Sequence, residues 1–246
     1  MRLEADTFTD LPMGDGVMRV HLLRPQGDGR HPAIILYSEI YQVTAPIRRT
    51  AAYLASHGFV VGIPEVYHEY EVPGTVLAYD KPGTDRGNEL KFAKPVAGYD
   101  ADCRAALDFL KAHPNSTGAL GAFGVCLGGH LAFRAALQPD VKATACFYAT
   151  DLHTHTLGAG ANDGSLARAE EISGALLMVF GRQDPHVPLD GRNMIRNRLE
   201  DAGVNYEWHE VNAAHAFMRD EGPRYDAELA RFGYDSALRL FRQELR

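Results

Sequence analysis

Residues 123–130 read Phe123-Gly124-Val125-Cys126-Leu127-Gly128-Gly129-His130 and join a short apolar run to a helical one. Glycines stand two positions before and two positions after Cys126. This G-x-C-x-G spacing is typical of a sharp turn between a strand and a helix. In so tight a reversal, side chains at Gly124 and Gly128 would collide with neighbouring backbone, and the residue at the tip is strained. The stretch therefore predicts a strand–turn–helix unit with Cys126 at its tip.

Strands and helices alternate along the chain on either side of this turn. We expect strands over 2–9, 17–24, 33–37, 59–63, 119–124, 143–149, 175–180 and 206–211, the first two joined by the turn Gly14-Asp15-Gly16. We expect helices over 46–57, 99–113, 127–137, 190–202 and 224–243. Residues 65–95, rich in proline and glycine, should form a long irregular excursion with one short helix. The alternation predicts one α/β domain over residues 1–246, with a mostly parallel sheet and helices on both faces.

Composition argues against several other classes of protein. The chain has 246 residues and a net charge of −7, and no run of Lys and Arg exceeds two residues. Nucleic-acid binding would require a basic face, which this composition does not announce. No apolar run approaches the roughly 18 residues of a membrane span, and the first residues lack the apolar core of a signal peptide. Three scattered cysteines argue against a disulfide framework, so we expect a cytoplasmic protein.

Cys126 is the candidate nucleophile. A cysteine above a helix N-terminus lies in the positive field of the helix dipole, which favours the thiolate. The backbone N–H of Leu127 would point toward the oxyanion that forms at an attacked carbonyl. Two other interpretations stay open: Cys126 as a small buried apolar residue, and the glycine-rich turn as a phosphate site. The phosphate fingerprints G-x-G-x-x-G and G-K-[ST] do not occur here.

An acid and a histidine follow at the ends of later strands. Asp184 comes after strand 175–180, and His215 comes after strand 206–211. The order nucleophile, acid, histidine predicts that Asp184 orients His215, which takes the proton of Cys126 and later activates water. Asp184 could instead stabilise a turn, and His215 could be an ordinary loop histidine. The rival histidines are His130 inside a helix, His186 too close to Asp184 in sequence to approach Cys126 from the other side, and His209 within a strand.

A carboxylate stands directly after the first buried strand. Strand 33–37 ends in Ser38-Glu39-Ile40-Tyr41. The residues at this position would supply a second oxyanion donor, and the N–H of Ile40 is the candidate. If Glu39 is desolvated, its pKa rises and it can exchange a proton with Cys126. The competing interpretation is a capping or surface glutamate.

Taken together, these motifs resemble the dienelactone hydrolase family, from about Pro32 to the C-terminus. The resemblance rests on SEIY at 38–41, PEVY at 64–67, GVCLGG at 124–129, DPHVP at 184–188 and HAFMR at 215–219. Membership would imply an α/β-hydrolase fold without cofactor or metal that hydrolyses carboxymethylenebutenolides, which are unsaturated lactones. The partner would be a small-molecule lactone or ester, with no nucleic acid and no membrane, and the protein would be a monomer or a small homo-oligomer.

The resemblance also implies roles for individual residues. Cys126 would be the nucleophile, with His215 and Asp184 completing a triad. Glu39 would hold the cysteine neutral until substrate arrives and then accept its proton. The oxyanion hole would be formed by the backbone N–H groups of Ile40 and Leu127.

Substrate contacts follow from the same resemblance. The family anchors the substrate carboxylate with two arginines, and Arg219 matches one of them. Tyr148 matches a tyrosine near the family's active site. The second arginine would come from residues 80–92, where the local sequence departs from the family. The candidates there are Arg86 and, as point charges without a bidentate fork, Lys91 and Lys94.

The residue types predict attack of a thiolate on an ester or lactone carbonyl, with a thioester intermediate. Because a thiol adduct expels an enolate easily and an alkoxide poorly, plain alkyl esters should be poor substrates. Two other functions stay open: a cysteine-dependent esterase or thioesterase of different specificity, and a catalytically silent ligand-binding protein on this scaffold. The sequence His153-Thr154-His155 is similar to a metal-binding H-x-H, but no carboxylate or cysteine stands at a matching spacing.

Overall fold

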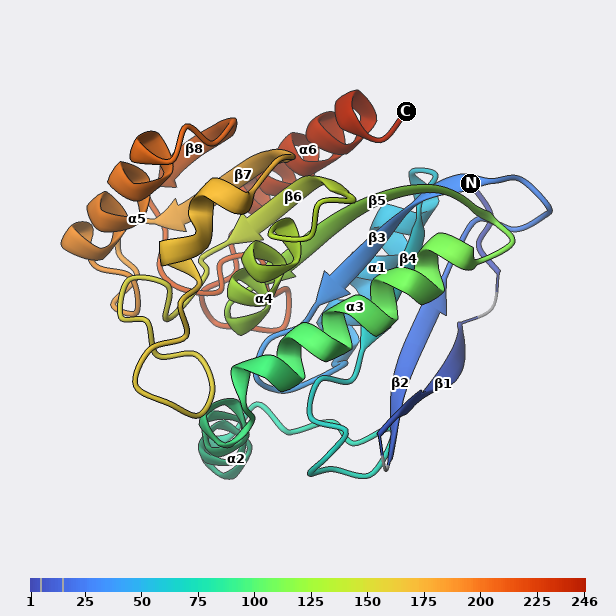
Figure 1. The fold of residues 1–246 in the computed structure, drawn as a ribbon, viewed down its shortest axis with the longest axis horizontal. Helices are drawn as coiled ribbons and strands as arrows, with labels where there is room; N and C mark the ends of the chain where they lie inside the picture. Colours follow the sequence, from blue (N-terminus) through green and yellow to red (C-terminus); the bar gives the residue numbers. More distant parts are fainter. Residues whose placement is uncertain (5, 15) are drawn as a thin grey trace.

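The structure, a computed structural model, describes residues 1–4, 6–14 and 16–246 (Figure 1). In that part of the chain, eight strands form one sheet. The strands are β1 (Thr7–Met13), β2 (Gly16–Leu23), β3 (His31–Tyr37), β4 (Val60–Pro64), β5 (Ser116–Val125), β6 (Val141–Phe147), β7 (Ala175–Gly181) and β8 (Tyr206–Val211). The helices are α1 (Ala45–Ser56), α2 (Lys81–Ala93), α3 (Val96–Ala112), α4 (Leu127–Ala136), the 3₁₀ helix η1 (Leu166–Glu171), α5 (Leu189–Asp201) and α6 (Ala227–Glu244).

The strand order creates a crevice at one end of the sheet. The order is β1-β2-β4-β3-β5-β6-β7-β8, antiparallel at β1–β2 and β2–β4 and parallel from β4 to β8. The chain leaves β3 toward β4 on one side, and β5 later pairs with β3 on the other side. Loops after β3 and β5 therefore leave in opposite directions, which is where α/β sheets bind ligands. The segment after Tyr37 lies next to the turn after Val125.

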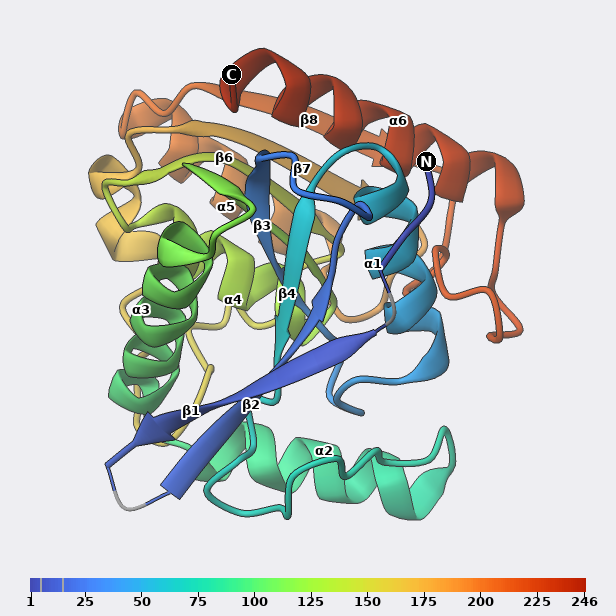
Figure 2. The same cartoon turned by 90° about the vertical axis from the view of Figure 1, so that its right-hand side faces the viewer.

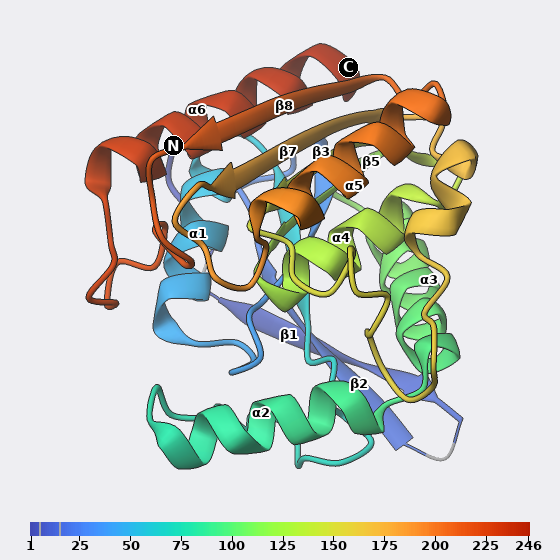
Figure 3. The same cartoon turned by 90° about the vertical axis from the view of Figure 1, so that its left-hand side faces the viewer.

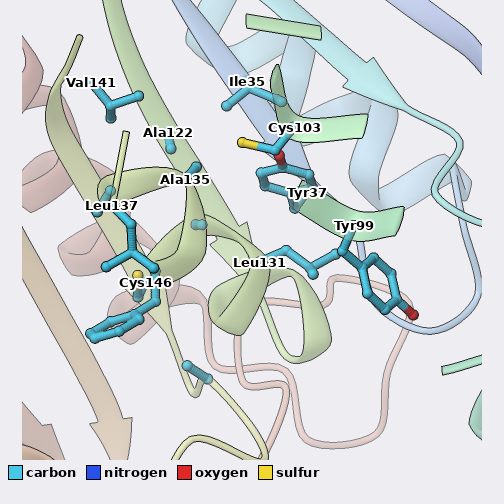
Figure 4. Packing of buried hydrophobic residues seen from close by; sticks show 14 of the residues in the cluster. Ile35, Tyr37, Tyr99, Cys103, Ala122, Leu131, Ala135, Leu137, Val141 and Cys146 are labelled. Carbon is cyan, nitrogen blue, oxygen red and sulfur yellow. The ribbon is translucent and has the colours of Figure 1, made fainter. Parts of the chain in front are cut away.

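Helices cover both faces of the sheet. The helices α3, α4 and α5 pack on one face, and α1 and α6 pack on the other (Figure 2). All residues of β7 are buried, as expected for a parallel strand covered on both sides. On the first face, Ile35 and Tyr37 of β3 pack with Cys103 of α3 and Leu131 of α4 (Figure 4). The predicted α/β class and mostly parallel sheet are confirmed.

Most of the expected elements are present, with ends that differ by a few residues. The first strand is wrong by more than that: it covers Thr7–Met13 rather than 2–9, because Leu3 makes only an isolated bridge to Pro25. The expected turn between the first two strands includes Asp15, which lies outside the described residues. The 3₁₀ helix η1 has no counterpart in the sequence prediction.

Helix α2 is the main correction to the sequence prediction. Residues 65–80 are irregular as expected, but the one helix within 65–95 is longer than expected, with thirteen residues. Pro82 lies in its first turn, where the missing N–H costs no hydrogen bond. Asp80 caps the helix, since its side chain accepts a hydrogen bond from the Gly83 N–H at 2.8 Å. Proline and glycine therefore mark the beginning of a helix here.

Helix α2 lies across one end of the sheet, away from the helices that cover its faces (Figures 2 and 3). Two of its glycines permit a close approach. A Cβ at Gly83 would lie 2.1 Å from the carbonyl oxygen of Ala78, and one at Gly87 would lie 2.6 Å from that of Ile40. The Tyr67 hydroxyl donates to the Gly87 carbonyl at 3.2 Å. The helix thus packs backbone to backbone against the segment that follows β3.

We expect Gly87→Ala to lower the free energy of unfolding. Alanine is favoured over glycine inside a helix by about 1 kcal/mol. The new Cβ would however meet backbone that cannot rotate away, and overpacking costs about 1–3 kcal/mol. Urea unfolding measures the balance, with Gly16→Ala as the control, because the nearest atom to a Cβ there is 3.9 Å away. A Gly87→Ala protein as stable as the wild type would contradict the backbone contact.

Candidate active site

Cys126 stands at the tip of the turn between β5 and α4. Its φ of 59° and ψ of −124° put a non-glycine residue in strained backbone. A Cβ at Gly124 would lie 1.8 Å from the carbonyl oxygen of Gly128, and one at Gly128 would lie 2.3 Å from that of Tyr37. The glycines are therefore required by close approach, as their spacing indicates. Cys126 is the N-cap residue of α4, so its thiol lies in the positive field of the helix dipole.

Asp184 and His215 form a buried pair. They follow β7 and β8, and they are 3% and 6% exposed. His215 Nδ1 lies 2.7 Å from Asp184 Oδ2. The backbone N–H of His186 donates to the other oxygen, Asp184 Oδ1, at 2.8 Å. Because the carboxylate is held from both sides, it fixes the imidazole and leaves Nε2 for another partner.

Several contacts define the protonation of His215. Burial lowers its pKa, but the charge of Cys126 and hydrogen bonds with Asp184 and Cys126 outweigh burial and raise the pKa to about 10. A protonated imidazole beside the sulfur is therefore favoured at neutral pH. Two rings hold the imidazole edge-on: Tyr148 at 5.0 Å and His186 at 4.6 Å between ring centroids.

Glu39 follows β3 and is only 3% exposed. Its Oε2 accepts a hydrogen bond from the Tyr79 hydroxyl at 2.9 Å, and its Oε1 lies 3.8 Å from Arg219 Nη1. Burial raises the pKa of Glu39, although Arg219, Tyr79 and His215 favour its charged form. Glu39 is thus a buried carboxylate rather than a surface or capping residue. Its partners are the Tyr79 hydroxyl and the Arg219 guanidinium, whereas Cys126 and His215 line the cavity together.

A cavity of about 310 Å³ opens above these residues. Its walls come from the loop after β3, the turn at Cys126, the loop after β8 and one face of α2. Thr84, Asn88 and Lys91 supply that face, at positions i, i+4 and i+7 of the helix. The titratable or charged lining residues are Glu39, Tyr41, Lys91, Cys126, His186, His215, Arg219 and Arg224.

The two expected oxyanion donors come from different segments of the chain. Ile40 lines the cavity in the loop after β3. Leu127 is the first residue of α4, and its side chain is fully buried. The N–H groups in the first turn of a helix have no acceptor within the helix. The backbone of Leu127 is therefore the part of this residue that can serve the site.

Arg219 reaches the cavity from the loop after β8. Its Nε is buried without a hydrogen-bond partner, and its guanidinium carbon lies 4.3 Å from the ring centroid of Tyr79. A guanidinium with unused donors at a cavity wall can bind a carboxylate through two parallel hydrogen bonds. Tyr148 does not line this cavity; it lies behind His215 and, with Glu39 and Arg219, borders a smaller one.

The structure does not bring Arg86 to the site, so Arg86 is wrong as the second carboxylate anchor. Its guanidinium pairs with Glu71 at 2.7 Å and with Glu89 at 3.0 Å, and it does not line the cavity. The physical reason is the helix geometry of α2, which puts residues 86 and 91 on different faces. Lys91 is the cation of α2 that reaches the cavity, and it pairs with Asp151 at 3.0 Å.

His186 and Arg224 line the cavity, although neither is a predicted site residue. His186 is close to Asp184 in sequence, which suggests that it cannot approach Cys126 from the other side. The structure shows that this closeness puts the His186 ring against His215. The sequence Asp184-Pro185-His186 does indicate that His186 is near the site, because a residue two positions after the acid lies in the same loop. Arg224 lies in an irregular loop, which carries no periodic signal.

The remaining cysteines and the possible metal ligands lie elsewhere. Cys103 and Cys146 are free and buried in the core, and burial raises the pKa of the Cys103 thiol to about 12. Cys126 is therefore the cysteine with access to the cavity. Among the described residues, the one group that could offer three metal ligands is His68, Glu69 and Asp102.

A lysine already fills that group of possible ligands. The ammonium of Lys94 lies 2.6 Å from Glu69 and 2.5 Å from Asp102 and donates to the Val66 carbonyl at 2.9 Å. The two carboxylates therefore have a cation of the chain itself as their partner. In the part of the chain that the structure describes, none of the helices is long and apolar enough to span a membrane.

We expect the stability of Glu39→Gln relative to the wild type to rise with pH. The pKa of Glu39 is raised on folding, so the native state binds more protons than the unfolded chain between the ordinary pKa and the raised one. Stability of the wild type therefore falls across that window, and glutamine removes this loss. Urea unfolding at pH 4 and pH 7.5 measures the difference, and the pH 4 value of the same variant is its baseline. If the stability of Glu39→Gln relative to the wild type stays constant or falls between pH 4 and pH 7.5, the raised pKa is contradicted.

Comparisons with known proteins agree with the geometry. The family model "Dienelactone hydrolase family" matches residues 18–245. A Saccharomyces cerevisiae protein named "Putative carboxymethylenebutenolidase" is 41% identical over 99% of this chain and 93% of its own length. A Pseudomonas putida protein named "Carboxymethylenebutenolidase" is 29% identical over 81% of this chain and 80% of its own.

Solved structures share the fold. The crystal structure of a "Putative Dienelactone Hydrolase" from Klebsiella pneumoniae superposes with a TM-score of 0.83 at 24% identity, covering 99% of this chain and 100% of that one. The family resemblance predicted from the sequence is confirmed by the family model and by these relatives. This chain belongs to the dienelactone hydrolase family of carboxylic ester hydrolases.

Proposed function

We propose that this protein hydrolyses an anionic lactone or activated ester through Cys126, His215 and Asp184, with a thioester acyl-enzyme. The observation that carries the proposal is a convergence in one cavity. A thiol at a helix N-terminus, a histidine paired with a buried acid and an arginine with unused donors all face the same space. The names of the curated relatives support a lactone as the substrate.

In the first half of the reaction, the Cys126 thiolate attacks the carbonyl carbon and forms a C–S bond. The N–H groups of Ile40 and Leu127 stabilise the oxyanion. As the oxyanion collapses, the C–O bond to the leaving group breaks, and its electron pair leaves on the enolate oxygen. His215, protonated at the start, gives that oxygen its proton.

In the second half, water attacks the thioester carbonyl carbon. His215, now neutral, takes a proton from this water, and Asp184 stabilises the imidazolium that forms. The C–S bond breaks, and its electron pair returns to Cys126 as the thiolate. One water is consumed, and the product carries a new carboxylic acid and the released enol.

The cavity supports a small anionic substrate. Arg219, Arg224 and Lys91 line it, whereas Asp151 pairs with the lysine and Glu39 faces the first arginine. A guanidinium with free donors fits a planar carboxylate better than an ammonium does. We therefore propose that Arg219 binds the substrate carboxylate, while Lys91 contributes a point charge from α2.

We expect Cys126→Ala to lose lactone hydrolysis by about 10³-fold or more, since the attacking atom is removed. The loss of ultraviolet absorbance of a purified dienelactone measures this. Cys146→Ala is the matched control, because Cys146 is buried in β6 and does not line the cavity.

Three outcomes separate the functions. Fast lactone turnover that requires Cys126 supports the proposal. Cysteine-dependent cleavage of p-nitrophenyl esters without lactone turnover favours an esterase of other specificity. Turnover of neither, with one ligand bound per chain, favours a silent binding protein.

We expect Arg219→Lys to raise KM for an anionic lactone by about 10-fold or more, because a charged hydrogen bond is worth about 1.5–3 kcal/mol. Steady-state kinetics on the anionic lactone and on neutral p-nitrophenyl acetate check this. An equal loss on both substrates would contradict a role for Arg219 in binding the carboxylate.

A further inference from the structure

Tyr79 is a half-buried side chain that connects three parts of the site. It lies in the segment between β4 and α2, one position before the cap residue Asp80. Its hydroxyl donates to Glu39 Oε2 at 2.9 Å and lies 2.8 Å from Thr44 Oγ1. Because the tyrosine proton goes to the carboxylate, the hydroxyl of Thr44 donates to the tyrosine oxygen. The hydroxyl of Tyr79 is thus held from two sides.

The ring of Tyr79 contacts the guanidinium of Arg219. The guanidinium carbon of Arg219 lies 4.3 Å from the ring centroid, which is a cation–π distance. Tyr41 packs edge-on against the same ring at 4.6 Å between centroids. One side chain therefore holds the carboxylate of Glu39 by its hydroxyl and the guanidinium of Arg219 by its face.

This arrangement determines where the two oxygens of Glu39 point. Oε2 accepts from Tyr79, and Oε1 faces Arg219. Cys126 lines the same cavity as His215, and its negative charge favours the protonated form of that histidine. The family resemblance implies a different resting state, in which the glutamate holds the cysteine neutral. In this chain, the tyrosine competes for that carboxylate.

We propose that Tyr79 is a positioning residue that keeps Glu39 turned toward Arg219 and away from Cys126, so that the resting thiol shares its proton with His215. The proposal deepens the proposed function and rests on Cys126 as its nucleophile. A carboxylate released from Tyr79 would find the S–H group of Cys126 as a donor in the same cavity. A negative charge that turns toward the sulfur disfavours the thiolate.

The other titratable groups near Cys126 and Glu39 either stay neutral near pH 7 or already have a charged partner or a fixed position. Burial raises the pKa of the three tyrosines that face them, which are Tyr67, Tyr79 and Tyr148. Burial lowers the pKa of His186, so this ring stays neutral to a lower pH than an exposed histidine does. The remaining charged groups around the cavity are Lys91 with Asp151, Asp184 behind His215, Arg219 and Arg224.

The test is the rate at which iodoacetamide alkylates Cys126 between pH 5 and pH 9, followed by mass spectrometry of the Cys126 peptide. We expect the wild type to react at a nearly constant rate from pH 6 to pH 9, as a thiolate–imidazolium pair does. Tyr79→Phe keeps the ring and removes the hydroxyl. We expect its rate to fall about 10-fold at pH 6–7 and to rise with pH, because one pKa unit changes the thiolate fraction tenfold.

A second substitution separates positioning from a general structural effect. In the double variant with Tyr79→Phe and Glu39→Gln, the competing carboxylate is gone, so the flat pH profile should return. Tyr70→Phe is the matched control: its hydroxyl donates to the Ala93 carbonyl, and it lies in the same segment outside the cavity.

Two results would overturn the proposal. One is a Tyr79→Phe profile that superimposes on those of the wild type and Tyr70→Phe. The other is a wild-type rate that rises through pH 8–9 as for an isolated thiol. Alkylation reports ionisation of Cys126 whether or not substrate turns over, so absence of lactone hydrolysis would count against the proposed function alone.

Discussion

The backbone contact between the cysteine turn and the end of β3 is the constraint on which the site depends. Gly128 lies so close to Tyr37 that a Cβ at the glycine would be 2.3 Å from the tyrosine carbonyl oxygen. The contact holds Cys126 at a positive φ and points its thiol out of the N-terminus of α4. Because Glu39 and Ile40 follow Tyr37 within three residues, the same contact puts a carboxylate and an N–H group on the cavity that the thiol faces.

Burial then gives each of these groups its chemical character. Glu39 is removed from water, so its charge depends on Arg219 and on the hydroxyl of Tyr79. His215 is removed from water as well, yet the sulfur and the buried acid keep its proton. Each ionised group has a specific partner, and in a low-dielectric site the choice of partner determines where the protons rest. A substrate would therefore enter a cavity in which these charged groups already have partners of opposite charge.

The parts of this site at strand ends are accessible from sequence, and the parts in loops are not. Parallel strands end at one edge, so spacing alone brings Cys126, Asp184 and His215 together. The length of helix α2 was not predictable from its prolines and glycines, because Pro82 lies in the first turn and the glycines serve tertiary contacts. Tyr79 carries no periodic signal at all, since its position follows from the path of an irregular segment.

The residues Thr84, Asn88 and Lys91 of α2 form a single stripe that lines the cavity. The glycines of α2 form another stripe, which packs closely against the backbone of Ala78 and Ile40. One face of α2 therefore contacts the cavity, and another face packs the helix against the rest of the protein. Substitutions at the three stripe residues would change the cavity wall and leave the glycine contacts of α2 in place. The segment between β4 and α3 is therefore where substitutions would change substrate specificity without changing the reaction.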